Sequence, residues 1–244
     1  MEIRLPSGWT LIVKEQTVST NEDVKALPAF SDKTVVCAEM QTAGRGRIGR
    51  RWDSPKGNLY LSVCVELPDL KGAEFYSFLS ALALSDAIQE CCPEIEIRCK
   101  WPNDLLIKGK KVSGILLETN GKNRLIVGMG VNIVEFPADK MLYPATSLKA
   151  NGCSIRKELL LETLIRCFDF WQKRFQKEGK EPLLNAWRAK AYGIGGDIIV
   201  NLPDRQLKGT FDGLDNDGCL LLNRKGEIIK IMTGDVFFRF DEKE

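Results

Sequence analysis

The chain has 244 residues, of which 44% are hydrophobic and 28% are charged, the composition of an ordinary globular protein. Its 35 Lys and Arg residues nearly balance its 33 Asp and Glu residues, so a net charge of +2 argues against a general polyanion-binding protein. Histidine is absent, which excludes Ser-His-Asp and Cys-His catalytic systems and HExxH metal sites. The chemistry must therefore use Lys, Arg, Asp, Glu, Ser, Thr and the backbone.

Size and cysteine usage predict a protein that folds without disulfides or a structural metal ion. A chain of this length buries enough surface to need no disulfide or structural metal. The eight cysteines include no CxxC pair, and Cys91 and Cys92 are adjacent, which suits neither zinc nor a disulfide framework. We therefore expect free thiols in a reducing cytoplasm. The first residues contain no signal peptide, and no apolar run reaches the about 18 residues that cross a bilayer, so we expect no membrane partner.

The first half of the chain reads as strands around one helix. Residues 34–38 form a short apolar run, and residues 59–65 and 95–100 alternate apolar and polar side chains, the period of a strand. A helix is predicted over 73–91. Its apolar residues at the spacing of one helix face are Phe75, Phe78, Leu79 and Leu82.

Two hairpins are expected next. One turns at residues 108–111, and Asn120-Gly121 links 112–119 to 124–131. Asn-Gly is the strongest short-range hairpin signal, because both residues accept a positive φ.

A long helix follows, with Ser154 as the expected N-cap and with Gly179 and Pro182 as the expected stop. Its apolar face carries Leu160, Leu164, Phe168, Trp171 and Phe175. Beyond a boundary near residue 195, short strands alternate with polar turns, which predicts a small β-barrel. The expected strands are 198–202, 209–214, 219–222 and 228–232.

Residues 44–52 are rich in glycine and arginine. Their GxGxxG pattern is followed by Pro55 and Gly57 where the dinucleotide fingerprint requires a helix, so we reject that interpretation. A single-strand nucleic-acid contact, with Trp52 stacking on a base, and a solvated surface turn are weaker alternatives. The favoured interpretation is a clamp for a phosphorylated small molecule, in which arginine forks neutralise phosphate oxygens.

A second group of polar residues follows strands further along the chain. In residues 100–104 (KWPND), the proline presents the two polar side chains after it, although an Asx turn would explain them without a ligand. Lys111 precedes Gly114 by three residues, and a glycine inside a strand marks close approach by a ligand or another backbone. Residues 128–132 (GMGVN) repeat this pattern, for which a β-bulge is the structural alternative.

Together these segments resemble the biotin protein ligase family. The matching segments, in the family's order and spacing, are AEMQTAGRGRIGRRW (38–52), KWPND (100–104), KVSGILLE (111–118) and GMGVN (128–132). Two further elements, VSTN (18–21) and ATSL (145–148), are similar to family motifs. The resemblance covers nearly the whole chain.

The resemblance implies an α+β fold. A mixed β-sheet catalytic domain with helices, class II synthetase-like, would occupy residues 1–194, and a small SH3-like C-terminal β-barrel would occupy residues 195–244. Only 18 residues precede Ser19, so we expect no N-terminal DNA-binding domain and no DNA partner. The sequence leaves open whether two copies form a homodimer.

The activity implied is that of an ATP-dependent ligase. It would activate biotin as biotinyl-5′-AMP and transfer biotin to a lysine of a biotin carboxyl carrier protein of a biotin-dependent carboxylase. Mg²⁺ would bridge the ATP phosphates without a fixed protein site. The first step needs no general base, because a carboxylic acid with a pKa near 4 is already ionised at neutral pH.

The resemblance also assigns residues to roles. Lys111 is expected to hold the biotin carboxylate, and Trp52 to cover the adenine. The expected catalytic residues are Arg47, Lys111 and Asp104, with Asp104 the candidate proton acceptor. The expected biotin-binding residues are Ser19, Thr20, Asn21, Gln41, Gly44, Arg45, Gly46, Arg47, Lys111 and Gly114. The expected ATP-binding residues are Arg47, Arg50, Trp52, Asn103, Asp104 and Asn132.

Two alternative functions remain. Lipoate–protein ligase uses a related scaffold and the same adenylate chemistry, but Trp52 after the arginine loop and the KWPND segment favour biotin. A nucleic-acid-binding module with residues 44–52 as a basic patch is the alternative of another class; it would bind single strands in a salt-dependent way and consume no ATP.

Overall fold

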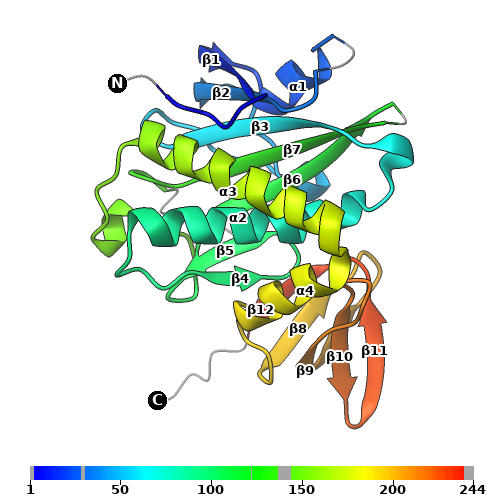
Figure 1. Ribbon diagram of the computed structural model, residues 1–244. Helices are drawn as coiled ribbons and strands as arrows, with labels where there is room; N and C mark the ends of the chain where they lie inside the picture. The colour runs from blue at the N-terminus through cyan, green and yellow to red at the C-terminus, as the bar shows by residue number, and fades with distance from the viewer. Residues whose placement is uncertain (1–2, 29–30, 122, 137–143, 239–244) are drawn as a thin grey trace.

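Seven strands form the larger of two β-sheets in the computed structural model, which describes residues 3–28, 31–121, 123–136 and 144–238. The strand order is β1-β2-β3-β7-β6-β5-β4 (Figure 1). Strands β1 and β2 are parallel and every other neighbouring pair is antiparallel, so the predicted mixed sheet is confirmed. The strands are β1 (Thr10–Thr17), β2 (Thr34–Gln41), β3 (Leu59–Glu66), β4 (Arg98–Lys100), β5 (Asp104–Ile107), β6 (Lys110–Asn120) and β7 (Arg124–Val131).

The two predicted hairpins of this sheet are confirmed. Between β5 and β6, Lys108 and Gly109 have φ values of 48° and 74°, the positive values that a tight two-residue hairpin turn requires. Between β6 and β7, Asn120 pairs with Arg124 around the predicted Asn-Gly turn. These turns place Gly114 of β6 opposite Gly130 of β7 in the middle of the sheet, and Lys111 of β6 opposite Leu106 of β5.

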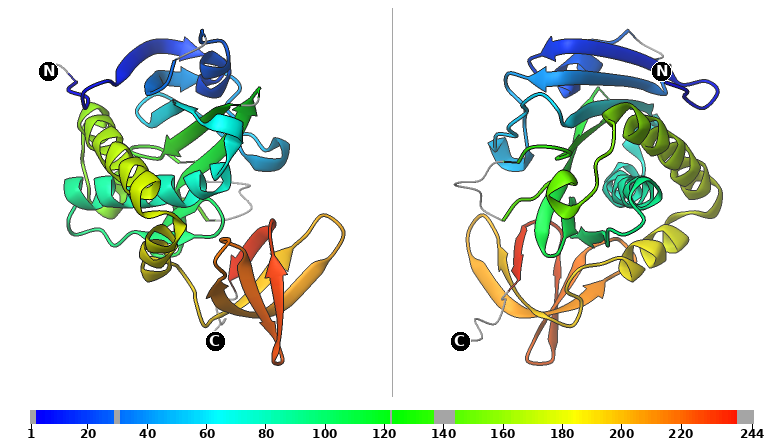
Figure 2. Two further views of the ribbon diagram at one scale, coloured as in Figure 1. Left: turned by 45° about the vertical axis from the view of Figure 1, so that its right-hand side comes forward. Right: turned by 90° about the vertical axis from the view of Figure 1, so that its left-hand side faces the viewer.

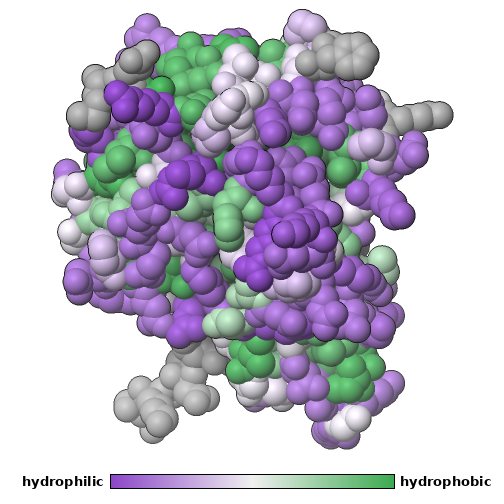
Figure 3. Space-filling model, viewed as in Figure 1, coloured by the Kyte–Doolittle hydropathy of each residue, from purple (hydrophilic) through white to green (hydrophobic). Residues whose placement is uncertain are grey.

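Helices α2 (Tyr76–Cys91) and α3 (Lys157–Glu178) lie side by side across one face of the sheet (Figure 1). The predicted apolar faces of both helices are confirmed, since Leu79, Leu82, Leu164 and Phe168 are fully buried. The outward-facing side of this layer is mostly polar (Figure 3). Burying these apolar side chains stabilises the fold by about 25 cal/mol for each Å² removed from water.

The ends of α3 differ from the prediction. Its N-cap is Arg156, two residues after Ser154. Gly179 does end the helix, but Pro182 does not stop it, because a separate helix α4 (Lys180–Ala189) already begins at Lys180. Proline is tolerated in a first helical turn, where its missing N–H would have no helical acceptor.

A second, five-stranded antiparallel sheet follows, with the order β11-β10-β9-β8-β12 (Figure 2). Its core includes Val200, Phe211 and Leu222. Four of its strands were predicted, and β12 was not. Together the two sheets and their helices confirm the predicted α+β fold class, whereas the domain boundary between residues 194 and 195 stays a prediction. The strands are β8 (Asp197–Asn201), β9 (Gln206–Leu214), β10 (Leu220–Arg224), β11 (Glu227–Ile231) and β12 (Asp235–Phe238).

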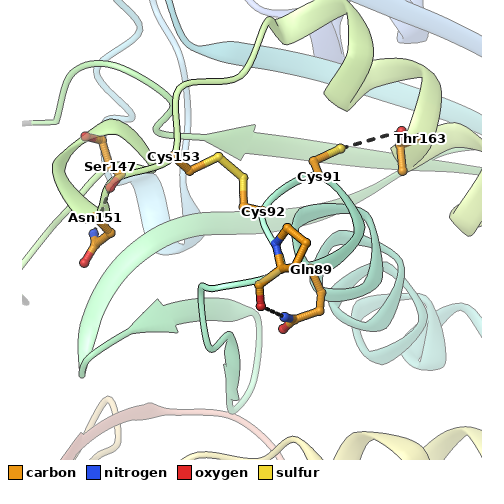
Figure 4. The surroundings of a disulfide bond; sticks show 8 residues. Gln89, Cys91, Cys92, Ser147, Asn151, Cys153 and Thr163 are labelled. Carbon is orange, nitrogen blue, oxygen red and sulfur yellow. Dashed lines mark hydrogen bonds between the residues drawn. A yellow bond between two sulfur atoms is a disulfide. The ribbon is translucent and has the colours of Figure 1, made fainter.

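The expectation that every cysteine is a free thiol is wrong. Cys92, just after α2, forms a disulfide with Cys153, and their Cα atoms are 5.9 Å apart (Figure 4). The partners are 61 residues apart in sequence, and spacing alone does not reveal which cysteines a fold brings together. The other six cysteines are free.

Across the described ranges, every helix is too short or too polar to serve as a membrane span.

Candidate active site

A cavity of about 350 Å³ collects most of the residues predicted for the site. It lies against strands β6 and β7, the arginine loop 44–52 and the start of β5, and it also reaches β12 of the smaller sheet. The predicted residues that line it are Ser19, Thr20, Asn21, Gln41, Arg45, Gly46, Arg47, Arg50, Trp52, Asn103, Asp104, Lys111 and Gly114.

One end of the cavity is lined by neutral polar groups, which are hydrogen-bonded to one another and to the Glu118 carboxylate behind them. Gln41, at the end of β2, accepts hydrogen bonds from the backbone N–H of Thr20 at 2.9 Å and from its hydroxyl at 3.2 Å. Ser62 of β3 donates to the Thr20 hydroxyl at 2.7 Å, and Asn21 donates to Glu118 at 2.6 Å. Because each side chain is held by its neighbours, this end presents donors and acceptors in fixed directions. Ser62 and Glu118 were not predicted as site residues.

The central ion pair joins Lys111 of β6 to Asp104 of β5. Lys111 Nζ lies 2.6 Å from Asp104 Oδ1, and the two side chains are 16% and 9% exposed. The same ammonium lies 5.3 Å from the centre of the Trp52 ring. The lysine expected to hold a carboxylate and the carboxylate expected to accept a proton are therefore paired with each other in this structure.

A second lysine, Lys100, lies beside this pair and was not predicted as a site residue. It is 4% exposed, lines the cavity and stands opposite Asp104 in the β4–β5 pairing. Burial lowers the pKa of Lys100 to about 7; the nearby Asp104 carboxylate opposes this change and the Lys111 ammonium adds to it. Lys100 belongs to the KWPND segment that the sequence analysis singled out. The sequence alone could not show that this lysine is buried between two charged neighbours.

Trp52 packs onto two glycines of neighbouring strands. A Cβ at Gly114 would lie 3.0 Å from Trp52 Cζ3, and a Cβ at Gly130 would lie 2.6 Å from Trp52 Cε2. Real side chains do not tolerate the shorter approach, so Gly130 is required for this position of the indole. The close approach predicted from glycines in strands is thus made by a side chain of the same chain. The buried Trp52 Nε1 has no hydrogen-bond partner among the described residues.

The arginines of the loop point to different partners. Arg45 forms ion pairs with Glu22 and with Glu118, the latter at 3.1 Å. Hydrogen bonds from Lys25 and Arg45 lower the pKa of Glu22. Arg45 is therefore neutralised at the polar end of the cavity, whereas Arg47 and Arg50 of the same loop turn toward the opposite side.

On that opposite side the loop meets the smaller sheet. Arg47 donates hydrogen bonds of 3.1 Å to Asn103 Oδ1 and to Thr233 Oγ1, and Arg50 forms a two-pronged ion pair with Asp235. Thr233, just before β12, and Asp235, at its start, were not predicted as site residues, because no element was predicted after residue 232.

Two predicted residues, Gly44 and Asn132, lie outside the cavity lining. The Gly44 carbonyl accepts a hydrogen bond of 2.9 Å from the Trp52 N–H and so closes the base of the loop. The buried Asn132 amide donates to the Thr146 carbonyl at 3.0 Å, and the Thr146 N–H in turn donates to the Lys111 carbonyl. Both residues thus hold neighbours of the cavity in place through hydrogen bonds. Their direct contact with a ligand stays a prediction.

No three His, Cys, Asp or Glu side chains gather into a metal-binding group within the part of the chain that the structure describes. The expected bridging of phosphates by Mg²⁺ also stays a prediction.

Known protein families match both sheets. The sequence model of the Biotin/lipoate A/B protein ligase family matches residues 11–133, and that of the Biotin protein ligase C terminal domain matches residues 193–239. The chain therefore belongs to the biotin/lipoate A/B protein ligase family.

Individual relatives match over nearly their whole length. The biotin--[acetyl-CoA-carboxylase] ligase of Paracoccus denitrificans is 36% identical over 237 residues, which cover 91% of this chain and 98% of that protein. The enzyme of the same name from Mycobacterium tuberculosis is 34% identical over a match that covers 94% of this chain and 90% of that protein. Among solved structures, the biotin protein ligase of Aquifex aeolicus in complex with biotin and ATP superimposes with a TM-score of 0.82 at 31% identity, covering 94% of this chain and 98% of that one.

We predict that Gly130→Ala destabilises the protein by about 1–3 kcal/mol, because the new methyl group collides with the Trp52 ring in a packed site. Urea unfolding measures the loss. Gly46→Ala is the matched control, since its Cβ would meet nothing closer than 3.6 Å. Equal stabilities for the two variants would contradict the packing described here.

The buried amine of Lys100 predicts a pH-dependent stability. Its pKa is about 7 in the folded protein and ordinarily 10.5, so between these values the unfolded chain binds more protons. The unfolding free energy therefore rises with pH across this window. Relative to Lys100→Met, the wild-type protein should gain stability from pH 7 to pH 10 in urea titrations. A difference that is constant with pH would rule out the lowered pKa.

Proposed function

We propose that this protein activates biotin with ATP and transfers it to a lysine of a biotin carboxyl carrier protein of a biotin-dependent carboxylase. The observation that carries the proposal is one cavity lined both by a fixed network of neutral polar groups and by the cations of Lys111, Arg47 and Arg50. The polar end suits an uncharged cyclic urea, and the cationic side suits a carboxylate beside a triphosphate. The names of the relatives from three bacteria support the same activity.

In the first step, a carboxylate oxygen of biotin attacks the α-phosphorus of ATP. A new C–O–P bond forms, the bond to the β-phosphate oxygen breaks, and pyrophosphate leaves with the electron pair. The obstacle is electrostatic, because two like charges 4 Å apart repel by about 4 kcal/mol at an effective dielectric constant of 20. Lys111 and the two arginines are placed to offset this repulsion. An entering anion also favours the charged form of Lys100.

In the second step, the carrier lysine attacks the carbonyl carbon of the mixed anhydride, and AMP leaves. The attacking amine must lose a proton, since its ordinary pKa is about 10.4. Asp104 is our candidate acceptor. Its carboxylate pairs with Lys111 through Oδ1 at 2.6 Å, so we assign the proton to the other oxygen, Oδ2.

The remaining assignments are proposals on the same basis. We assign Ser19, Thr20, Asn21, Gln41 and Arg45 to the biotin side. We assign Arg50, Trp52 and Asn103 to the ATP side, with Mg²⁺ bound through the phosphates. We propose a catalytic domain over residues 1–194 and an SH3-like domain over residues 195–244. A cytoplasmic location, the absence of DNA binding and a homodimer stay predictions from the sequence.

Pyrophosphate release tests the proposed function directly. Biotin and MgATP without any carrier should yield pyrophosphate. Lys111→Ala should slow this release at least a hundredfold, because the repelling anions lose a positioned cation. Lys110→Ala is the matched control, since the neighbouring lysine is exposed. A folded wild-type protein that releases no pyrophosphate would refute adenylation, and normal rates in Lys111→Ala would remove that lysine from the mechanism.

Competition between biotin and lipoate tests the substrate. In an assay that follows the transfer of labelled biotin to the carrier, unlabelled biotin should suppress the labelling at concentrations where lipoate has no effect. The reason is that the hydrogen-bonded polar end of the cavity needs a urea-like partner. Preferential suppression by lipoate would assign the alternative ligase activity.

A further inference from the structure

The smaller sheet contributes to the wall of the active-site cavity. Asp235 and Val236 of β12 line it, together with Arg47 and Arg50 of the loop. Strand β12 lies on the side of the smaller sheet that faces the larger one (Figure 2). The proposed reaction assigns no role to Asp235 or Val236.

Two hydrogen-bonded links join this sheet to the loop. Arg50 Nη1 lies 3.2 Å from Asp235 Oδ1, and its second terminal nitrogen pairs with Oδ2 of the same carboxylate. Arg47 donates to Thr233 Oγ1 at 3.1 Å while its other terminal nitrogen donates to Asn103 at 3.1 Å. The partners are 185 and 186 residues apart in sequence, so the contacts depend on how the two sheets are placed.

A carboxylate in this position has an electrostatic cost. The Asp235 side chain is 15% exposed, and it faces a cavity where we propose that a triphosphate binds. Asp235 and Arg50 both act on the buried Lys100, the carboxylate raising its pKa and the guanidinium lowering it. An unneutralised anion here would repel ATP, so its pairing with Arg50 is needed for the site to accept a phosphate.

The geometry indicates that Asp235 positions Arg50 and does not compete with a phosphate for it. A guanidinium has five N–H donors in a rigid plane, and a two-pronged carboxylate pair uses two of them and fixes the plane. Arg50 also lines the cavity, so the guanidinium plane that Asp235 fixes faces the space where we propose that ATP binds. Asp235 thus orients the guanidinium without using all of its donors.

We propose that Asp235, assisted by Thr233, is a positioning residue that holds Arg50 and Arg47 toward the phosphate side of the cavity, so that the smaller sheet completes the active site. This inference rests on the proposed function. It assigns to the C-terminal segment an indirect part in ATP binding, through the arginines rather than through contact with the nucleotide.

Asp235→Asn tests the inference by steady-state pyrophosphate release with the full chain. Because the amide cannot accept both guanidinium hydrogen bonds as an anion does, KM for ATP should rise about tenfold, while KM for biotin changes less than twofold. Asp235→Glu should recover part of the loss. Asp212→Asn, an exposed carboxylate on β9 of the same sheet, is the matched control and should leave both KM values unchanged.

A double-mutant cycle with Arg50→Gln shows whether Asp235 acts through that arginine. Asp235→Asn should add nothing in the Arg50→Gln background, whereas independent, additive effects would overturn the proposal. An unchanged KM for ATP in Asp235→Asn would also overturn it. A lower KM would show that Asp235 competes with phosphate for Arg50, which likewise contradicts positioning.

Two further measurements separate other causes of failure. Thermal unfolding checks that Asp235→Asn is folded; if it is not, Thr233→Val removes one hydroxyl and should still raise KM for ATP about threefold. An unchanged KM in a folded Thr233→Val would then count against the proposal. A wild-type protein without pyrophosphate release refutes the proposed function itself, whereas an active wild type with an unaffected Asp235→Asn refutes the positioning role alone.

Discussion

Electrostatic repulsion between substrates is the constraint that organises this site. A carboxylate and a triphosphate must be brought into contact, and water screens their charges less once both are enclosed. The chain places Lys111, Arg47 and Arg50 around one cavity, and in this structure each cation already has an anionic or polar partner. Asp104 and Asp235 therefore keep the cations in place before any substrate arrives.

The fold supports this arrangement through closely packed backbone. Two short hairpins set the register of β5, β6 and β7, so that Lys111 and Asp104 meet at a distance of 2.6 Å. Glycines of β6 and β7 leave space for the Trp52 ring above the sheet. The loop 44–52 thus rests on the sheet through Trp52 and on β12 through Arg50.

Much of this could be predicted from local sequence pattern. Alternation over 59–65, the Asn120-Gly121 turn and the helical spacing of Phe75 to Leu82 depend on neighbouring residues, and all three predictions are confirmed. Thirteen of the predicted site residues line one cavity, because each motif lies on a strand of the same sheet or directly follows one. Strand β1 and helix α1 (Thr20–Lys25) were missed, since the alternation of Thr10–Thr17 is weak and α1 has only six residues.

Properties that depend on distant contacts could not be predicted in this way. The Cys92–Cys153 disulfide joins residues 61 positions apart, and the contact of Asp235 with Arg50 spans 185. The burial that lowers the pKa of Lys100 arises from the packing of several elements around one amine. Each of these features is set by tertiary structure, which local periodicity does not encode.

The central claim is that one cavity holds both anions against the same cations. A crystal structure of the protein soaked with biotin and MgATP tests it most directly. Our account predicts continuous density for biotinyl-5′-AMP, with the ring system against Thr20 and Gln41 and the phosphate beside Lys111 and Arg50. Biotin and nucleotide bound in separate places, or a ligand that contacts none of these residues, would contradict it.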